Sequence, residues 1–375
     1  MASMELRNVT VVMGTRPDAI KMAPVVLECR KHRDRLTTMI VSTAQHRQML
    51  DQVLEVFQLE PDVDLNLMRE NQQLGDLTAR LLTELNALWQ RTRPDLVLVQ
   101  GDTTSSMAAA LVAYYHKIPI GHIEAGLRTQ KKYAPFPEEM NRRLIGVLAD
   151  VHWAPTPAAR EHLLREGIAD RAIHVTGNTG IDALHYTLER IRQTGFIPQE
   201  LDPAVFGYKK LVLVTAHRRE SFGEGVRGIC EGLKAVARRR PDVAMLYPVH
   251  PNPNIQEPVR ASLSKVPNIY LTAPLAYRSF VYAMERADVI LTDSGGIQEE
   301  APFLGKPVLV LREVTERGEA VDAGASEVVG MDAEQIVSRT LARLDDEIPW
   351  TPRPNLFGDG CASERITRTV LEHFS

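Results

Sequence analysis

Short, continuous apolar runs recur along this chain, separated by longer helix-like stretches, and this rhythm constrains the fold more than any other feature. The runs are rich in Val and Ile and do not alternate with polar residues, as is typical of strands covered on both faces of a parallel sheet. The sequence therefore predicts an α/β fold. Candidate strands in the first half are residues 9–13, 38–42, 96–100, 118–123, 151–154 and 172–175, with helices at 17–31, 74–90, 105–116 and 138–148.

The same rhythm restarts at Leu211, after a stretch (194–210) that contains two Gly and two Pro residues. A chain of 375 residues has room for two domains of about 150 residues or more. Two successive βαβ series predict two doubly wound, Rossmann-like domains, an N-terminal one at 1–193 and a C-terminal one at 194–360. A last helix, at about 361–375, is expected to pack back on the first domain, with the second as the alternative. Candidate strands of the second series are 211–216, 243–248, 268–271, 289–292 and 307–311.

Composition excludes several classes of protein. The chain has 44 Lys and Arg against 48 Asp and Glu, and a net charge of −4 argues against binding nucleic acid through counterion release. No apolar run reaches the roughly 18 residues of a membrane span. Cys29, Cys230 and Cys361 lie far apart, in no metal-binding or redox spacing, so we expect free thiols, a cytoplasmic protein and no metal.

Ligands of doubly wound sheets bind at the carboxyl ends of strands, so residues that follow strands are the candidate site. Arg16 follows the first strand and Gly14, at the start of a helix where an anion is favoured; a surface Arg beside a capped helix is the alternative. Asp102 follows the strand 96–100, either as a functional carboxylate or as the N-cap of the next helix. Glu124 ends another apolar strand, where a structural role is harder to find. Glu138 opens a helix, where an acidic residue also suits the helix dipole.

The second series repeats this pattern. His217 follows the strand 211–216, and His250 follows the next strand; both can titrate near neutrality or donate to phosphate. Ser294 is expected to cap a helix, while Gly295 and Gly296 allow a phosphate to approach backbone N–H groups. Glu300, nearly two turns into that helix, is suited to bind a ribose diol.

One glycine pattern is interpreted as accidental. Residues 223–228 match G-x-G-x-x-G, but the first Gly lies several residues beyond its strand, and Asp242 precedes the following strand instead of ending it. Lys306 follows Gly305 but is itself followed by Pro307, so no P-loop is present.

Taken together, these motifs closely resemble the bacterial non-hydrolysing UDP-N-acetylglucosamine 2-epimerases. The resemblance implies a glycosyltransferase-B type fold with a deep interdomain cleft, a homodimer, no cofactor and a role in cell-envelope polysaccharide biosynthesis. The matching segments are 14–21, 43–47, 101–104, 121–129, 137–142, 176–179, 215–221, 247–251, 292–302 and 315–319.

The resemblance also implies a reaction, the interconversion of UDP-N-acetylglucosamine and UDP-N-acetylmannosamine through elimination of UDP and a 2-acetamidoglucal. It implies site residues as well. The expected catalytic set is Asp102, Glu124, Glu138 and His217; the expected substrate-binding set is Arg16, Lys21, His250, Leu275, Phe280, Ser294, Gly295, Gly296, Glu300 and Arg317. Asp102 and Glu138 are the acid–base candidates, and Glu124 is expected to orient the sugar or tune a neighbour. A core position is the alternative for Phe280.

The chain departs from the family pattern at a few positions. Asp18 stands where Glu is usual. Gly318 follows Arg317 at a position where the family commonly has Pro. Some family members are activated by a second substrate molecule; Gln45, Gln48, Gln72 and Arg218 match that activator site, but Asn71 replaces an Arg found in activated members.

Other functions remain open at this stage. A hydrolysing epimerase would release free N-acetylmannosamine and UDP, and a UDP-dependent glycosyltransferase would need an acceptor. A non-catalytic nucleotide-sugar sensor would bind without exchanging the proton at C2. A nicotinamide dehydrogenase would rest only on the glycines at 223–228.

Overall fold

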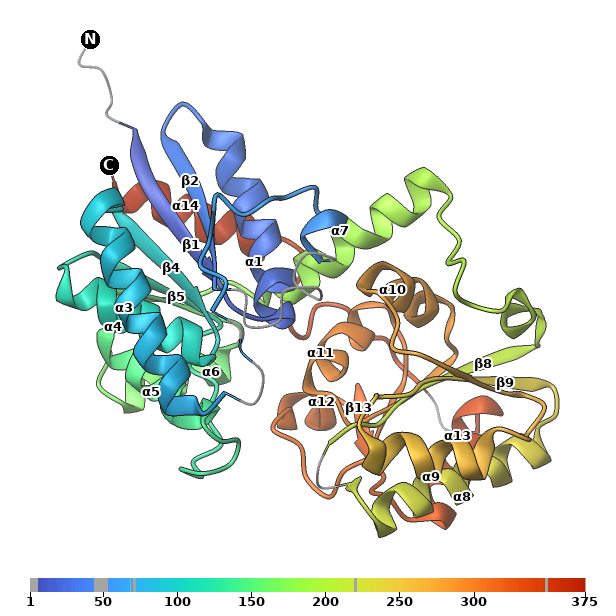
Figure 1. The fold of residues 1–375 in the computed structure, drawn as a ribbon. Helices are drawn as coiled ribbons and strands as arrows, with labels where there is room; N and C mark the ends of the chain where they lie inside the picture. Colours follow the sequence, from blue (N-terminus) through green and yellow to red (C-terminus); the bar gives the residue numbers. More distant parts are fainter. Residues whose placement is uncertain are drawn as a thin grey trace. The chain divides into compact units, whose positions relative to one another are not determined.

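The computed structural model describes residues 6–43, 53–67, 69, 72–218, 221–347 and 350–374 (Figure 1). The chain divides into two compact units, one made of Met1–Tyr186 with Gly358–Ser375 and the other of Thr187–Phe357. The predicted boundary after residue 193 falls near the end of helix α7, which runs from the first unit into the second.

The first unit is built on a parallel sheet, which has seven strands over the described residues, in the order β3-β2-β1-β4-β5-β6-β7. Register follows the apolar runs, because Val11 lies opposite Ile40 on one side and Leu98 on the other. The strands are β1 (Arg7–Met13), β2 (Leu36–Ser42), β3 (Val63–Asp64), β4 (Leu96–Gln100), β5 (Ile120–Ile123), β6 (Val151–Ala154) and β7 (Ile173–Val175).

Helices cover this sheet and bury its apolar side chains. Val12, Val97 and Val99 pack with the apolar faces of α3, α4 and α5 in one core cluster. Helix α14, from the end of the chain, packs beside α1 (Figure 1). The helices are α1 (Arg16–Cys29), α3 (Leu74–Thr92), α4 (Thr104–Tyr115), α5 (Glu138–Leu148), α6 (Pro157–Arg165), α7 (Thr179–Thr194) and α14 (Ala362–His373), with short 3₁₀ turns at Arg30–His32 and Asp170–Ala172.

The second unit repeats the design with a parallel sheet in the order β10-β9-β8-β11-β12-β13. Its main core joins Leu233 of α8, Ile336 of α13 and Met245 of β9. The strands are β8 (Lys210–Thr215), β9 (Val243–Pro248), β10 (Ile269–Thr272), β11 (Val289–Thr292), β12 (Val308–Val310) and β13 (Ser326–Val328). The helices are α8 (Glu224–Arg239), α9 (Pro253–Leu263), α10 (Tyr277–Arg286), α11 (Gly295–Phe303), α12 (Gly318–Asp322) and α13 (Ala333–Leu344), with a 3₁₀ turn at Pro203–Gly207.

The predicted fold class, two doubly wound α/β domains, is confirmed by these two sheets. Strands β3 and β13, which are edge strands of two and three residues, are not predicted from the sequence. The glycines at 223–228 serve the fold instead of a dinucleotide. Gly223 precedes α8 with φ of +75°, and a Cβ on Gly228 would lie 2.2 Å from the carbonyl oxygen of Met331.

Each sheet has a switch point, where the strand order reverses. In the first unit it lies between β1 and β4, and in the second between β8 and β11. In doubly wound folds the chain leaves such adjacent strands in opposite directions, and ligands bind outside the carboxyl ends of the strands there. The residues that follow these four strands are therefore the first place to look for a site.

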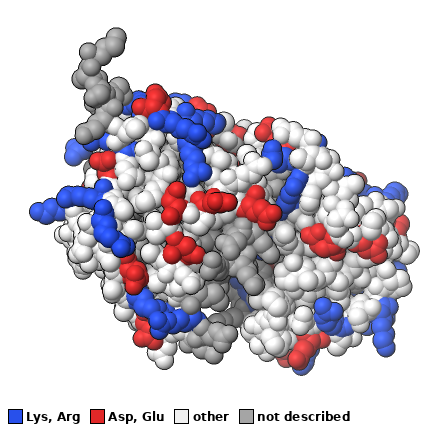
Figure 2. Space-filling model, turned by 45° about the horizontal axis from the view of Figure 1, so that its top comes forward, with Lys and Arg blue, Asp and Glu red and all other residues white. Residues whose placement is uncertain are grey.

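The distribution of surface charge and the hydropathy of the helices are consistent with the small net charge and the short apolar runs of the sequence. On the face in Figure 2, acidic and basic side chains are interspersed over the residues drawn in colour. Among the described residues, no helix is long and apolar enough to cross a bilayer.

Helix α14 is tied to the first unit by a buried carboxylate. Asp182 of α7 accepts hydrogen bonds from the backbone N–H of Ala362 (3.2 Å) and from the N–H (2.7 Å) and hydroxyl (2.5 Å) of Ser363. Asp182 thus caps the start of α14, since Cys361 at the N-cap position makes no side-chain capping bond.

Replacing Asp182 by Ala should lower the free energy of unfolding by about 2 kcal/mol, because three buried donors lose their acceptor. The matched control is Glu364→Ala, in the first turn of the same helix, where an exposed pair with Arg368 is removed; its effect should stay within about 0.5 kcal/mol. Urea denaturation measures both, and equal losses would contradict the anchoring role of Asp182.

Candidate functional sites at the two switch points

The turn after β1 is shaped by close packing and by a capping box. A Cβ on Gly14 would lie 2.4 Å from Oγ of Ser105, so only glycine allows this approach of the turn to α4. Thr15 is the N-cap of α1: its hydroxyl accepts from the N–H of Asp18, and the Asp18 carboxylate accepts from the N–H of Thr15 at 3.1 Å. Arg16 is the first residue of α1 and therefore stands at its N-terminus, as predicted.

Asp18 also joins this turn to the one after β4. Its Oδ2 accepts from the N–H of Gly14 (3.2 Å) and from the hydroxyl of Thr103 (3.2 Å). The side chain is almost completely buried, and burial raises the pKa of Asp18 from 3.8 to about 7 despite the bonds from Gly14 and Thr15. This link is not predicted from the sequence, in which Asp18 stands out only as a departure from the family pattern.

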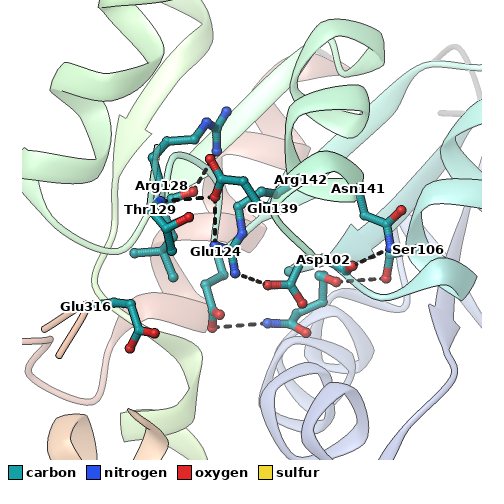
Figure 3. Close-up of polar contacts among 12 residues, drawn as sticks. Asp102, Ser106, Glu124, Arg128, Thr129, Glu139, Asn141, Arg142 and Glu316 are labelled. Carbon is teal, nitrogen blue, oxygen red and sulfur yellow. Dashed lines mark hydrogen bonds and ion pairs between the residues drawn. The ribbon is translucent and has the colours of Figure 1, made fainter. Parts of the chain in front are cut away.

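The turn after β4 carries Asp102. The N-cap of α4 is Thr103, whose hydroxyl accepts from the N–H of Ser106, so capping does not account for Asp102. The Asp102 carboxylate instead forms an ion pair with Arg142 of α5 (Figure 3). This pair fixes the orientation of the carboxylate, and the sequence analysis did not identify Arg142.

Three successive carbonyl oxygens of this turn accept side-chain hydrogen bonds from three different elements. The oxygen of Gln100 accepts from Ser106 of α4 (2.7 Å), that of Gly101 from Nε2 of His122 of β5 (2.8 Å) and that of Asp102 from Asn141 of α5 (2.9 Å). His122 is fully buried, and burial lowers its pKa to about 3. It therefore stays neutral and donates to Gly101. The backbone around Asp102 is thus held rigidly before any ligand arrives.

Glu124 lies at the end of β5 in a left-handed backbone conformation, with φ of +61°. Its Oε2 forms an ion pair with Lys21 of α1 and accepts hydrogen bonds from the side-chain amides of Gln100 (3.1 Å) and Asn178 (3.4 Å). Strained, non-glycine conformations of this kind persist only where surrounding contacts enforce them. Lys21 and Glu124, both predicted from the family resemblance, are therefore neighbours in the first unit.

The two acidic residues at the start of α5 have different surroundings. Glu139 is completely buried and bonded to Arg142 (3.3 Å), Arg143 (3.2 Å) and the N–H of Thr129 (3.0 Å). These bonds outweigh burial and lower its pKa. Glu138 has a buried Oε2 with no hydrogen-bond partner among the described residues. Glu139 therefore stabilises the start of α5 and the neighbouring loop, while Glu138 has a buried carboxylate oxygen without a hydrogen-bond partner in the described part of the chain.

In the second unit, the switch point is centred on Asp293, which follows β11. This fully buried carboxylate accepts from the N–H groups of His217 (2.6 Å) and Arg218 (2.8 Å) and lies 3.0 Å from Nδ1 of His217. The ring of His217 stacks on that of His250, with centroids 5.7 Å apart. Sequence reasoning found both histidines and missed Asp293.

The turn that follows Asp293 opens into α11. Ser294 occupies the N-cap position of α11, but its side chain makes no capping bond, so the predicted capping is wrong. Its N–H instead donates to the hydroxyl of Thr292 at 3.0 Å, a contact within the turn. A Cβ on Gly296 would meet no atom within 4 Å, so the backbone there is open to a ligand.

Arg317 lies against this turn. A Cβ on Gly295 would lie 2.8 Å from Cζ of Arg317, so the guanidinium packs directly on the glycine, and Glu299 of α11 holds Arg317 through a 2.8 Å ion pair. Glu300 follows Glu299 on α11 and is half-buried. The glycine turn thus starts a helix with a guanidinium beside it, which is suited to an anion.

Two predicted substrate-binding residues are not part of the turns described above. Leu275 is buried just before α10, and Phe280 is half-buried on that helix. Of the activator residues, Gln72 accepts from Arg80 at 2.5 Å and Arg218 donates through Nε to the carbonyl of Asp293 at 3.1 Å. Gln45, Gln48 and Asn71 lie outside the described residues.

Within the described part of the chain, no group of three or more His, Cys, Asp or Glu residues could hold a metal ion. Cys29 and Cys230 are buried free thiols, and burial raises the pKa of each to about 11.

Doubly wound sheets with a turn suited to an anion at the switch point are typical of the class of α/β proteins that bind nucleotides. Comparison with known proteins narrows this class. The family model for UDP-N-acetylglucosamine 2-epimerase matches residues 6–371. A probable UDP-N-acetylglucosamine 2-epimerase of Ralstonia solanacearum is 49% identical, over 99% of this chain and 100% of that protein. The chain therefore belongs to the UDP-N-acetylglucosamine 2-epimerase family.

Solved structures agree with this assignment. The Neisseria meningitidis UDP-GlcNAc 2-epimerase, bound to UDP-GlcNAc, is 45% identical with a TM-score of 0.89, over 97% of this chain and 100% of that one. The Methanocaldococcus jannaschii enzyme, in complex with UDP-GlcNAc and UDP, is 32% identical with a TM-score of 0.82, over 97% and 99% of the two chains.

The raised pKa of Asp18 predicts how stability depends on pH. The folded protein keeps a proton on Asp18 up to about pH 7, whereas the unfolded chain loses it near the ordinary value of 3.8. The folded state is therefore favoured at low pH, and this advantage is lost as the pH rises through about 7. Wild type should lose free energy of unfolding relative to Asp18→Asn between about pH 4 and pH 7.

Asn is the suitable replacement because all three bonds to Asp18 from the turns use a single oxygen, which an amide also offers. Urea denaturation of both proteins across the pH range gives the difference directly. A difference that does not change with pH would show that Asp18 titrates as in the unfolded chain.

Proposed function

We propose that this protein interconverts UDP-N-acetylglucosamine and UDP-N-acetylmannosamine by eliminating UDP and adding it back, without hydrolysing the sugar nucleotide. Membership of the epimerase family supports the reaction, and the UDP-GlcNAc bound to the Neisseria meningitidis relative supports the substrate.

The chemistry requires elimination because C2 of the sugar has no adjacent carbonyl and its hydrogen is not acidic. In the first step a base takes the C2 proton, the C2–H electron pair forms the C1–C2 double bond, and the C1–O bond breaks with its pair leaving on UDP. The product is 2-acetamidoglucal. In the second step a UDP oxygen bonds to C1 and an acid returns a proton to the other face of C2. The enzyme therefore needs two acid–base groups with different tasks, one that takes the C2 proton and one that returns a proton to the other face.

The observation that carries the proposal is the different surroundings of Asp102 and Glu138. The Asp102 carboxylate is bound to Arg142, whereas Glu138 keeps a buried, unpartnered oxygen. One helix, α5, carries Glu138 at its first residue and both Asn141 and Arg142 one turn later. The helix that presents Glu138 therefore also holds the backbone and the carboxylate of Asp102. Two acid–base groups set by one rigid helix keep a defined geometry through both half-reactions.

The other residues divide between the sugar and the nucleotide. Glu124, held by Lys21, orients the sugar. The diphosphate binds at Ser294, Gly295 and Gly296, with Arg16, His217, His250 and Arg317 as cationic or hydrogen-bonding partners. Glu300 binds the ribose, and Phe280 and the backbone near Leu275 contact uracil. No cofactor takes part in this scheme.

Further properties rest on the family resemblance alone. We expect a cytoplasmic homodimer that supplies precursors for cell-envelope polysaccharide. An activator site that includes Gln45, Gln48, Gln72 and Arg218 stays a prediction, and the Asn at 71 argues against it.

The decisive experiment is proton NMR of the purified protein with UDP-N-acetylglucosamine in heavy water. We expect UDP-N-acetylmannosamine to appear and deuterium to enter C2 of both isomers, because every turnover breaks and remakes the C2–H bond. Asp102→Asn and Glu138→Gln should each slow this exchange by about 10³-fold, as expected when an acid–base group is removed.

The matched control is Asp95→Asn. Asp95 precedes β4 just as Asp102 follows it, and it binds the N–H of Asn8 at 2.7 Å at the opposite end of the strand. This variant should keep wild-type exchange. Free N-acetylmannosamine as the main product would identify a hydrolysing epimerase, and bound substrate without exchange would identify a sensor; either result overturns the proposal.

A further inference from the structure

His217 is held from both neighbouring strands of its sheet. On the β9 side, the buried hydroxyl of Tyr247 donates to the carbonyl of Ala216 at 3.3 Å. On the β11 side, Oδ2 of Asp293 accepts from the N–H groups of His217 and Arg218 at 2.6 and 2.8 Å. The backbone that carries the imidazole is therefore fixed on both sides.

The same carboxylate also faces the ring of His217. Oδ1 of Asp293 is buried, has no hydrogen-bond partner among the described residues, and lies 3.0 Å from Nδ1 of His217, at ion-pair distance. Burial raises the pKa of Asp293, but the contacts with His217 and with the two backbone N–H groups lower the pKa by more than burial raises it. The net shift of the pKa is downward, so the Asp293 carboxyl group is ionised at neutral pH. An ionised carboxylate oxygen repels a lone pair at this distance and attracts an N–H, so the proton of the neutral His217 ring is favoured on Nδ1. In the neutral ring, Nε2 then keeps its lone pair.

His250, stacked on His217, has the opposite arrangement. Its Nδ1 accepts the backbone N–H of Asn252 at 3.2 Å, so this nitrogen supplies a lone pair and the proton of the neutral ring lies on Nε2. Burial, and then the nearby His217, lower the pKa of His250. Among the described residues, the charge of Asp293 lies beside both rings, and Arg218 donates through Nε to the Asp293 carbonyl at 3.1 Å.

We propose that Asp293 is a positioning residue that locks neutral His217 as the Nδ1–H tautomer, so that the stacked histidines form a matched pair in which Nε2 of His217 accepts and Nε2 of His250 donates. The roles of both residues toward UDP rest on the proposed function, whereas the tautomers do not. His250 can then donate to a phosphate oxygen without being charged. His217 can accept a proton at Nε2 and, once protonated, donate there as well.

The first test measures the tautomers in the resting enzyme, without substrate. Protein labelled with ¹⁵N-histidine is studied by long-range ¹H–¹⁵N correlation at about pH 8, above the ordinary histidine pKa of about 6.5. His217→Gln and His250→Gln assign the two rings. We expect Nδ1–H for His217 and Nε2–H for His250. Nε2–H on His217 in wild type would overturn the proposal.

The second test uses Asp293→Asn. The amide oxygen can still accept from the two backbone N–H groups, while the amide NH₂ now donates toward Nδ1 of His217 and drives the ring proton to Nε2. His250 should keep its tautomer. We expect kcat to fall about 100-fold or more with a much smaller change in KM, by analogy with the wrong-tautomer effect of removing the Asp charge in a Ser-His-Asp triad.

The matched control is Asp288→Asn, at the other end of the same two strands. Asp288 precedes β11 and its carboxylate binds the N–H of Leu211, at the start of β8, at 2.8 Å. This variant should keep wild-type kcat and the wild-type tautomer of His217, and thermal unfolding compares the stability of the two variants. An equal loss of kcat in both, or an unchanged tautomer in Asp293→Asn, would reduce Asp293 to a structural role. If the protein did not epimerise its substrate, the tautomers would still decide the proposal.

Discussion

The structure depends on satisfying backbone polar groups at the turns where each parallel sheet reverses its strand order. These turns lie beyond the last ladder bonds, yet helices bury them, and a buried N–H or C=O without a partner is costly. In the first unit the carboxylate of Asp18 binds N–H groups after β1 and the hydroxyl of Thr103 after β4. In the second, Asp293 binds N–H groups after β8 from its place after β11. The same solution, a buried aspartate side chain between two turns, thus occurs in both units.

The turns fixed in this way carry the candidate chemistry. Asp102 is surrounded by fixed partners, because three carbonyl oxygens around it accept from Ser106, His122 and Asn141. Electrostatic preorganisation of this kind places charged groups before the reaction instead of during it. The fixed backbone sets the positions of short polar side chains such as Asp102, while the glycine turn before α11 leaves its backbone open to an anion.

Much of this could be predicted from the sequence. The buried strands were found because their apolar runs are continuous, and His217 and His250 were found because each directly follows such a run. The edge strands β3 and β13 were missed because two or three residues give no periodicity. Ser294 was predicted to cap α11 and does not. For Asp102, capping was an open alternative until Thr103 was seen to cap α4.

The sequence by itself determined the α/β class, the two series of strands, and the residues that follow each strand, because these depend on local pattern and chain order. Only the tertiary structure decided which polar groups meet. Arg142 reaches Asp102 from 40 residues away, and Asp293 reaches His217 from 76 residues away. Such contacts depend on which strands lie side by side in the sheet and on the packing of α5 beside α4. No local sequence pattern predicts contacts between residues so far apart in the chain, because these contacts depend on how the whole sheet is buried.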